Sequence, residues 1–334
     1  MKKVLFSLTA MFFAGSLSAG CIDIPYGYPG DPLSSLINPC PYGFYVGLTG
    51  MWAVPTETGL GTFTDSWQYL NSDGSITSLS KPSKNDYEFA GGFQVGYDFP
   101  CSGNNIEVEY FHLHNSKHNV FGTSDGPISF GSIFFDVSFP LALLPEFVSD
   151  SRLKYHLNQV DVTLGHRFIA CSAKLQLHPF MGARFASLKH DLPFAFGEVR
   201  SRYHGAGPIG GIDCSYDFCK GFSLVGRFDG SLLMGKVKAD SRLTFGEINT
   251  RFESPSQNRL VSTFGGKLGL AYNFTCFTHS SVRFEVGYQA NNYIGVFDTI
   301  TGQDSSDPVL QRISSLTTNN FSYSGPYINL TWHL

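Results

Sequence analysis

The sequence predicts an all-β protein, an antiparallel transmembrane β-barrel of about ten strands, with twelve as the alternative count. Three observations predict this class. Segments of apolar/polar alternation recur along the chain, short and long connections between them take turns, and charged residues make up only 15% of the chain, whereas about 25% is usual. Aromatic residues also reach 15%, and 36 of the 334 residues are glycine.

The N-terminus carries the features of a secretory signal peptide. Two lysines precede an apolar run that ends at Phe13, small residues follow, and a cleavage after Ala19 fits the pattern. The apolar run is too short to span a bilayer. We therefore expect a signal peptide over 1–19, a periplasmic segment over 20–41 and one barrel domain over 42–334.

Strands are predicted wherever apolar residues alternate with polar ones. The stretch 87–115 shows this best, because two alternating runs flank a five-residue link at 100–104 and so indicate a hairpin. The remaining predicted strands are "FYVGLTGMWAV" at 44–54, "NQVDVTLGHRF" at 158–168, "KLQLHPFMGARF" at 174–185, "IGGIDCSYDF" at 209–218, "FSLVGRFDGSL" at 222–232, "FGGKLGLAYNF" at 264–274, "VRFEVGYQ" at 282–289 and "YINLTWHL" at 327–334.

The connections differ in length in a regular way. Short links are expected near 100–104, 170–173, 217–221 and 273–280, and long polar ones near 55–86, 115–153, 191–204, 235–259 and 296–320. Short periplasmic turns and long extracellular loops are typical of outer-membrane barrels, whereas a soluble sandwich, the alternative, has no reason to sort its loops.

One predicted loop segment, 127–147, is apolar for a surface loop. We expect a loop that contains a short hairpin. Three alternatives are a membrane hairpin that would bring the strand count to twelve, a loop folded into the lumen, and a contact surface for a neighbouring molecule.

Charged residues in the predicted strands take the parity opposite to the aromatic residues. A Lys or Arg that faced lipid at mid-bilayer would cost about 2–4 kcal/mol, so the aromatic side faces lipid and the charged side the lumen. We expect these charges to line a path for small hydrophilic solutes, and the alternative is that they pair and fill a narrow interior. The predicted lining residues are Glu107, Glu109, Asp161, Arg167, Lys174, Arg184, Asp213, Arg227, Asp229, Lys267, Arg283 and Glu285.

Seven cysteines are present, and their pairing cannot be read from the sequence. Cys21 and Cys40 precede the first strand, and Cys21 would be an acylated first residue if a lipoprotein signal were present. Cys214 lies on the outward side of a strand, and the odd count leaves one thiol for a bond between molecules. Four more fall in predicted short turns, in the oxidising periplasm where disulfides persist: Cys101, Cys171, Cys219 and Cys276.

Candidate chemistry is weak. The H-x-H-x3-H cluster of His112, His114 and His118 has ligand-like spacing for zinc, but histidines at a rim are common. The carboxylate pairs Glu107/Glu109 and Asp213/Asp217 share a lumen wall, which explains them without catalysis. We expect no catalytic residues, metal site or cofactor, and a net charge of −4 gives no reason to expect a nucleic-acid partner.

The end of the chain, "YSGPYINL", places Tyr323, Gly325, Ile328 and Leu330 in a pattern similar to the last-strand signal that the outer-membrane assembly machinery reads. Together with "NPCPYGFYVGLTGMW", "GFQVGYDFPCSGNNIEVEYFH", "NQVDVTLGHRF", "YHGAGPIGGIDCSYDFCKGF", "KLGLAYNF", "FEVGYQANNY" and "YINLTW", the chain resembles the Legionella-type major outer-membrane protein family from about residue 38 to 334. The long connections depart most from that pattern.

The resemblance implies a bacterial outer-membrane protein with porin character, an abundant surface antigen linked by disulfides, and no set of catalytic residues. The expected function is a porin-like channel for passive diffusion of small hydrophilic solutes and ions. The alternative is a barrel-anchored surface adhesin or antigen without an open pore. The expected partners are outer-membrane lipid, the assembly machinery, a second copy held by disulfides or packing, and a host-cell surface.

Overall fold

The computed structural model describes the chain from residue 43 to 334 with short gaps. The described ranges are 43–58, 64–70, 76–82, 87–100, 102–123, 128–132, 135–136, 147–170, 174–194, 197–219, 221–245, 248–277, 280–303 and 313–334. The predicted signal peptide and N-terminal segment lie outside these ranges. Within them, no helix is long and apolar enough to cross a bilayer.

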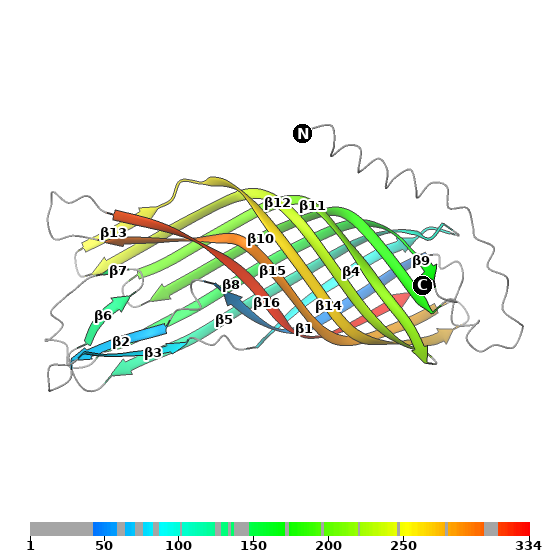
Figure 1. Cartoon of the computed structure of the whole chain (residues 1–334), viewed down its shortest axis with the longest axis horizontal. Helices are drawn as coiled ribbons and strands as arrows, with labels where there is room; N and C mark the ends of the chain where they lie inside the picture. Colours follow the sequence, from blue (N-terminus) through cyan, green and yellow to red (C-terminus); the bar gives the residue numbers. More distant parts are fainter. Residues whose placement is uncertain are drawn as a thin grey trace, which may run out of the picture.

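A closed antiparallel barrel of ten strands forms the body of the protein, which confirms the predicted class and the lower strand count. Each barrel strand pairs with the next one along the chain (Figure 1). The ring consists of β1 (Gly43–Glu57), β4 (Glu88–Asp98), β5 (Asn104–Thr123), β8 (Phe147–His166), β10 (Leu175–Phe194), β11 (Gly197–Cys219), β12 (Phe222–Phe245), β14 (Gln257–Phe277), β15 (Ser280–Gln303) and β16 (Ile313–His333).

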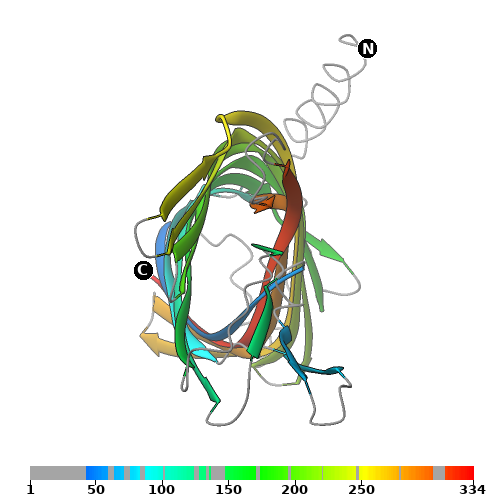
Figure 2. The same cartoon turned by 90° about the vertical axis from the view of Figure 1, so that its left-hand side faces the viewer.

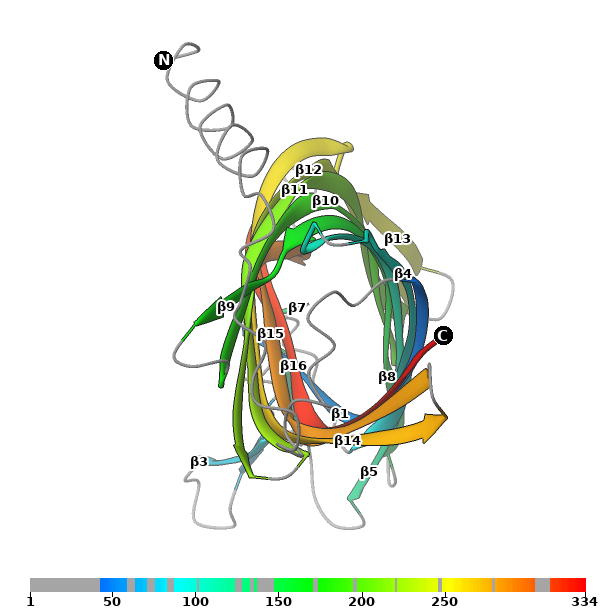
Figure 3. The ribbon, with the colours of Figure 1, turned by 90° about the vertical axis from the view of Figure 1, so that its right-hand side faces the viewer.

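The first and last strands close the ring. Tyr45 of β1 lies opposite His333 of β16, and Leu48 lies opposite Leu330, so no sheet edge is left between the two ends of the chain. Figures 2 and 3, which look along the barrel from its two ends, show the ring. Closure matters because hydrocarbon offers no partner for an unpaired backbone group.

Six shorter strands accompany the ring. β2 (Thr64–Leu70) and β3 (Ile76–Pro82) form a hairpin, β6 (Ile128–Ser132) pairs with β2 and with β7 (Phe135–Asp136), β9 (Phe168–Ala170) pairs with β10, and β13 (Ile248–Glu253) pairs with β12. The pairing of β6 with β7 confirms the short hairpin expected within 127–147, and this hairpin belongs to a separate small sheet. The rest of that segment falls outside the described residues.

The long loops are shorter than predicted, because the strands continue into the ranges expected to be loops. β10 continues to Phe194 and β11 begins at Gly197, so most of the expected loop 191–204 is strand, and β12, β14, β15 and β16 likewise extend into 235–259 and 296–320. These extensions alternate as the membrane strands do, but polar residues occur on both of their faces. A pattern of apolar against polar residues therefore misses them.

The two sides of the strands differ as predicted. Outward positions expose large apolar side chains, including Leu48 (66%), Leu268 (63%) and Met234 (72%). Near the short turns, aromatic rings pair on the outside, with centroids 4.8 Å apart for Phe44 and Tyr97 and 4.4 Å apart for Tyr272 and Phe274. An apolar band with such an aromatic girdle is the lipid-facing surface of an outer-membrane barrel.

The predicted short turns and the C-terminus belong to the same end of the barrel, because the strands that flank these turns end there. Leu334 donates its backbone N–H to Phe44 at 3.0 Å, and Asp98 and Asn104 flank the first turn there. In outer-membrane barrels the short turns are periplasmic, so this is the periplasmic end and the opposite, loop end is extracellular.

The barrel interior as candidate functional site

The periplasmic half of the interior is a charged chamber. A cavity of about 160 Å³ lies there, and its walls include Glu107, Arg167, Asp213, Arg283 and Glu285. Charges of both signs line this space, and several of them lie within ion-pair distance of one another along the wall. The chamber therefore offers both signs of charge to a hydrophilic solute.

Arginine and lysine side chains form ion pairs between the strands that line the chamber. Arg227 of β12 lies 3.3 Å from a carboxylate oxygen of Glu109 on β5, which is not a neighbouring strand, and 3.6 Å from Asp213. Lys267 reaches Glu285 at 3.1 Å. The Arg227 contact to Glu109 runs across the lumen, so it narrows the lumen at that level.

Arg184 is the buried node at mid-barrel. Its Nε and Nη2 donate to the two oxygens of Asp161 at 2.8 Å each, Nη2 also lies 2.9 Å from Asp229, and Nη1 donates to Thr263 at 3.0 Å. Arg184 is 3% exposed, Asp161 1% and Asp229 5%. A bidentate Arg–carboxylate pair is the strongest of these geometries. The cavity beside it is small, about 30 Å³, enough for one or two waters.

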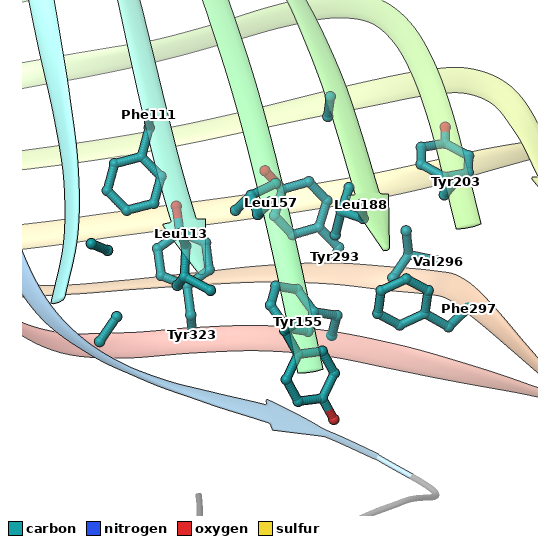
Figure 4. Packing of buried hydrophobic residues seen from close by; sticks show 14 of the residues in the cluster. Phe111, Leu113, Tyr155, Leu157, Leu188, Tyr203, Tyr293, Val296, Phe297 and Tyr323 are labelled. Carbon is teal, nitrogen blue, oxygen red and sulfur yellow. The ribbon is translucent and has the colours of Figure 1, made fainter. Parts of the chain in front are cut away.

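An aromatic cluster fills the barrel on the extracellular side of Arg184 (Figure 4). Phe321 is at its centre, with ring centroids 5.3 Å from Tyr155, 5.8 Å from Phe297 and 6.3 Å from both Tyr293 and Tyr323. The apolar cluster takes buried side chains from every strand of the ring. One from each, in chain order, are Met51, Ala90, Phe111, Leu157, Leu188, Tyr203, Leu233, Val261, Tyr293 and Phe321. All ten strands of the ring therefore contribute buried side chains to this cluster inside the barrel.

A bulge in β15 turns extra side chains into this cluster. The register with β16 shifts between Tyr293 and Phe297, and Gly295 has a φ of 69°, which favours glycine. After the bulge Val296, Phe297 and Asp298 are all buried, whereas a regular strand would turn every second one outward.

A second buried polar group lies beside the aromatic cluster, toward the extracellular end. Tyr155 donates its hydroxyl to Glu57 at 3.0 Å, and the side-chain amide of Asn319 donates to the other oxygen at 3.2 Å. The imidazole of His190 approaches Glu57 at 3.7 Å, and neither ring nitrogen has a hydrogen-bond partner among the described residues. Glu57 and His190 were missed by the sequence reasoning because they lie at the edge of segments expected to be loops.

Ten of the predicted lining residues form ion pairs inside the barrel, and Glu107 accepts a hydrogen bond from Tyr45 at 2.7 Å. Lys174 does not join them. It is exposed at the turn just before β10, at the periplasmic mouth. Tyr45, His178 and Asn105 belong to the same network, and sequence parity alone could have found them as inward residues.

The predicted cysteine and histidine positions are described only in part. Cys101, Cys171, Cys21 and Cys40 lie outside the described residues, while Cys219 ends β11 and Cys276 lies near the end of β14. Cys214 is a free, half-buried thiol. The Nδ1 atom of His112 lies within hydrogen-bond distance of Asn158 Oδ1, at 2.8 Å, and the ring of His114 lies beside that of His156. Among the described side chains, no three of the His, Cys, Asp and Glu type converge to hold a metal ion.

One family model matches most of the chain. The family model described as Legionella pneumophila major outer membrane protein precursor matches residues 39–334. No curated protein sequence matches the chain.

The solved structures that align with this chain are distant from it in sequence, and their TM-scores lie below 0.5. The outer membrane protease OmpT from Escherichia coli aligns with a TM-score of 0.49 and 10% identity over 87% of this chain and 96% of that one. A TodX deletion mutant, a monoaromatic hydrocarbon channel, gives 0.32 and 10% over 91% and 93%, and the Ralstonia pickettii toluene transporter TbuX gives 0.25 and 10% over 90% and 92%.

Proposed function

We propose that this chain, which belongs to the Legionella major outer membrane protein family, is a narrow, non-enzymatic channel for passive diffusion of small hydrophilic solutes and ions. It is a protein of the bacterial outer membrane. The observation that carries the proposal is the charged chamber, because a cavity lined by charges of both signs can stabilise hydrated ions.

The aromatic cluster is the constriction of the proposed channel. Barrels of about eight strands are filled by side chains and barrels of sixteen leave an open channel, so ten strands belong near the filled limit. Passage then requires the rings around Phe321 to move aside, and conductance is low. A solute that passes Arg184 must replace the hydrogen bonds that this side chain makes to Asp161 and Thr263.

The second candidate is a sealed barrel that anchors surface segments for adhesion or as an antigen. The same aromatic cluster favours it, since every strand of the ring contributes a buried side chain to that cluster. The two candidates differ in whether the cluster opens.

Planar-bilayer conductance of the refolded full chain tests the proposal. Wild type should conduct weakly, and Phe321→Ala should raise the single-channel conductance because it removes the central ring of the constriction. Phe264→Ala is the matched control, since Phe264 is an outward aromatic side chain, 50% exposed, and its loss should leave conductance unchanged.

Each variant is first checked for a folded barrel by its mobility on an unboiled gel. A sealed bilayer with wild type and Phe321→Ala alike would overturn the channel and leave the anchored barrel.

A further inference from the structure

A row of basic side chains crosses the outside of the barrel on one wall. His156 of β8 lies directly opposite Lys189 of β10, Lys189 opposite Arg202 of β11, and Arg202 opposite Lys238 of β12. We call these four residues the basic row. Their chain neighbours Leu157, Leu188, Tyr203 and Val237 are buried in the interior, so alternation turns the basic row outward.

The basic row lies just beyond the lipid-facing band. Four residues nearer the periplasmic end, the same strands carry an apolar outward row of Val160, Phe185, Ala206 and Met234. Phe185 is 50% and Met234 72% exposed. Four residues of strand span about 13 Å, and less along the membrane normal when the strand is tilted. Acyl chains on the apolar row would therefore bring their headgroups to the basic row.

Lys189, Arg202 and Lys238 have no carboxylate within 4.0 Å among the described residues. Toward the loops, Asp191 lies 3.6 Å and Glu198 2.6 Å from Arg200, and Asp240 lies directly opposite Arg200, two residues beyond Lys238 on the same face. Like charges placed directly opposite on neighbouring strands destabilise a sheet. Three such cations in a line repel one another, and an anion bound between them would relieve that repulsion.

The other wall of the barrel is different. Its outward positions toward the extracellular end include Thr56, Ser322 and Asn292, which face one another on β1, β16 and β15 and carry no charge. At these described positions the row of cations found on β8, β10, β11 and β12 is not repeated.

We propose that the basic row binds the sugar-linked phosphate groups of the glycolipid that forms the outer leaflet, with its acyl chains on Phe185 and Met234. Arginine and lysine are the side chains suited to phosphate, and clusters of them at a membrane surface recognise anionic headgroups. The site holds one or more lipid molecules at a fixed wall of the barrel. It does not depend on whether the lumen conducts.

Binding of purified lipid A to the refolded full chain in detergent tests this, read by native mass spectrometry. The probes are bis-phosphorylated lipid A and the same lipid after enzymatic removal of both phosphates. The variant is R202Q/K238Q. The control is R242Q/R251Q, which removes the same charge nearer the loops, where Arg242 lies 3.9 Å from Glu198 and Arg251 contacts Glu253.

Wild type and the control should prefer the bis-phosphorylated lipid, and R202Q/K238Q should bind it about thirtyfold more weakly, at about one factor of five per lost charge. Affinity of wild type should also fall as sodium chloride is raised. Equal binding of the two lipids by wild type, or equal weakening in variant and control, would overturn the proposal. So would displacement of the lipid by inorganic phosphate at equal concentration, which would make the site one for free phosphate. If R202Q/K238Q does not fold, the lipid comparison and salt titration on wild type still decide.

Discussion

Replacing Arg184 by glutamine measures whether the middle of the barrel is dry. Its guanidinium lies 2.8 Å from Asp161 and 2.9 Å from Asp229, and all three residues are at least 95% shielded from solvent. Removing one partner of a buried ion pair leaves uncompensated charge and costs about 3–5 kcal/mol, whereas a hydrated pair contributes about 0–1 kcal/mol. We expect the larger loss for R184Q.

The assay is reversible urea unfolding of the barrel in phospholipid vesicles, followed by tryptophan emission and by mobility on an unboiled gel. R283Q is the matched control, because the side chain of Arg283 is 30% exposed and lies 3.9 Å from Glu285, which keeps Lys267 at 3.1 Å. Its loss should be below about 1 kcal/mol. Adding D161N and D229N to R184Q should recover much of the stability, since neutral amides need no countercharge.

A loss below about 1 kcal/mol for R184Q, similar to that for R283Q, would refute the dry interior. It would mean that water screens the node and that the lumen is wider than its buried side chains indicate.

Three further changes test the packing of the wall. Gly96→Ala should lower the yield of folded barrel on an unboiled gel, because its Cβ would lie 2.1 Å from the Tyr45 ring, and Tyr45→Ala in the same chain should restore part of it. Leu268→Arg should cost about 2–4 kcal/mol in urea unfolding, and Leu260→Arg, nearer the edge of the apolar band, clearly less, whereas equal costs would contradict the assigned lipid band. Gly295→Ala should destabilise the barrel by about 1–2 kcal/mol because φ is 69° there, and an unchanged unfolding midpoint would show that the bulge relaxes without cost.

The sequence predicted the ring well because lipid imposes a strict rule on the outward face. At Leu48, Leu268 and Leu330, polar substitution would be costly, so alternation at these positions is clean and all ten barrel strands could be located. The parity of Arg184 and Asp161 followed from the same rule. The cost of placing a polar side chain against lipid acts on each strand separately, so each strand can be located by itself.

What the sequence could not give depends on several strands at once. The cluster around Phe321 combines side chains far apart in the chain, and its residues look like any other inward apolar positions. Glu57 and His190 were missed because the extensions of β1 and β10 lie beyond the apolar band, where no constraint from lipid marks the strand. The basic row also became visible only when registers placed Lys189, Arg202 and Lys238 side by side.

The inner and outer faces of the same strands therefore serve separate purposes at the extracellular end. At Leu188 and Lys189, consecutive residues of β10, one side chain fills the lumen and the next meets the lipid headgroups. Because a strand turns successive side chains to opposite faces, the closure of the lumen and the binding of lipid can change independently by substitution. Removing the central ring of the cluster should then alter conductance without altering lipid affinity, and removing the basic row should do the reverse. A variant of either kind that moved both measurements would show that the lipid holds the wall in its closed packing, and the two proposals would have to be joined.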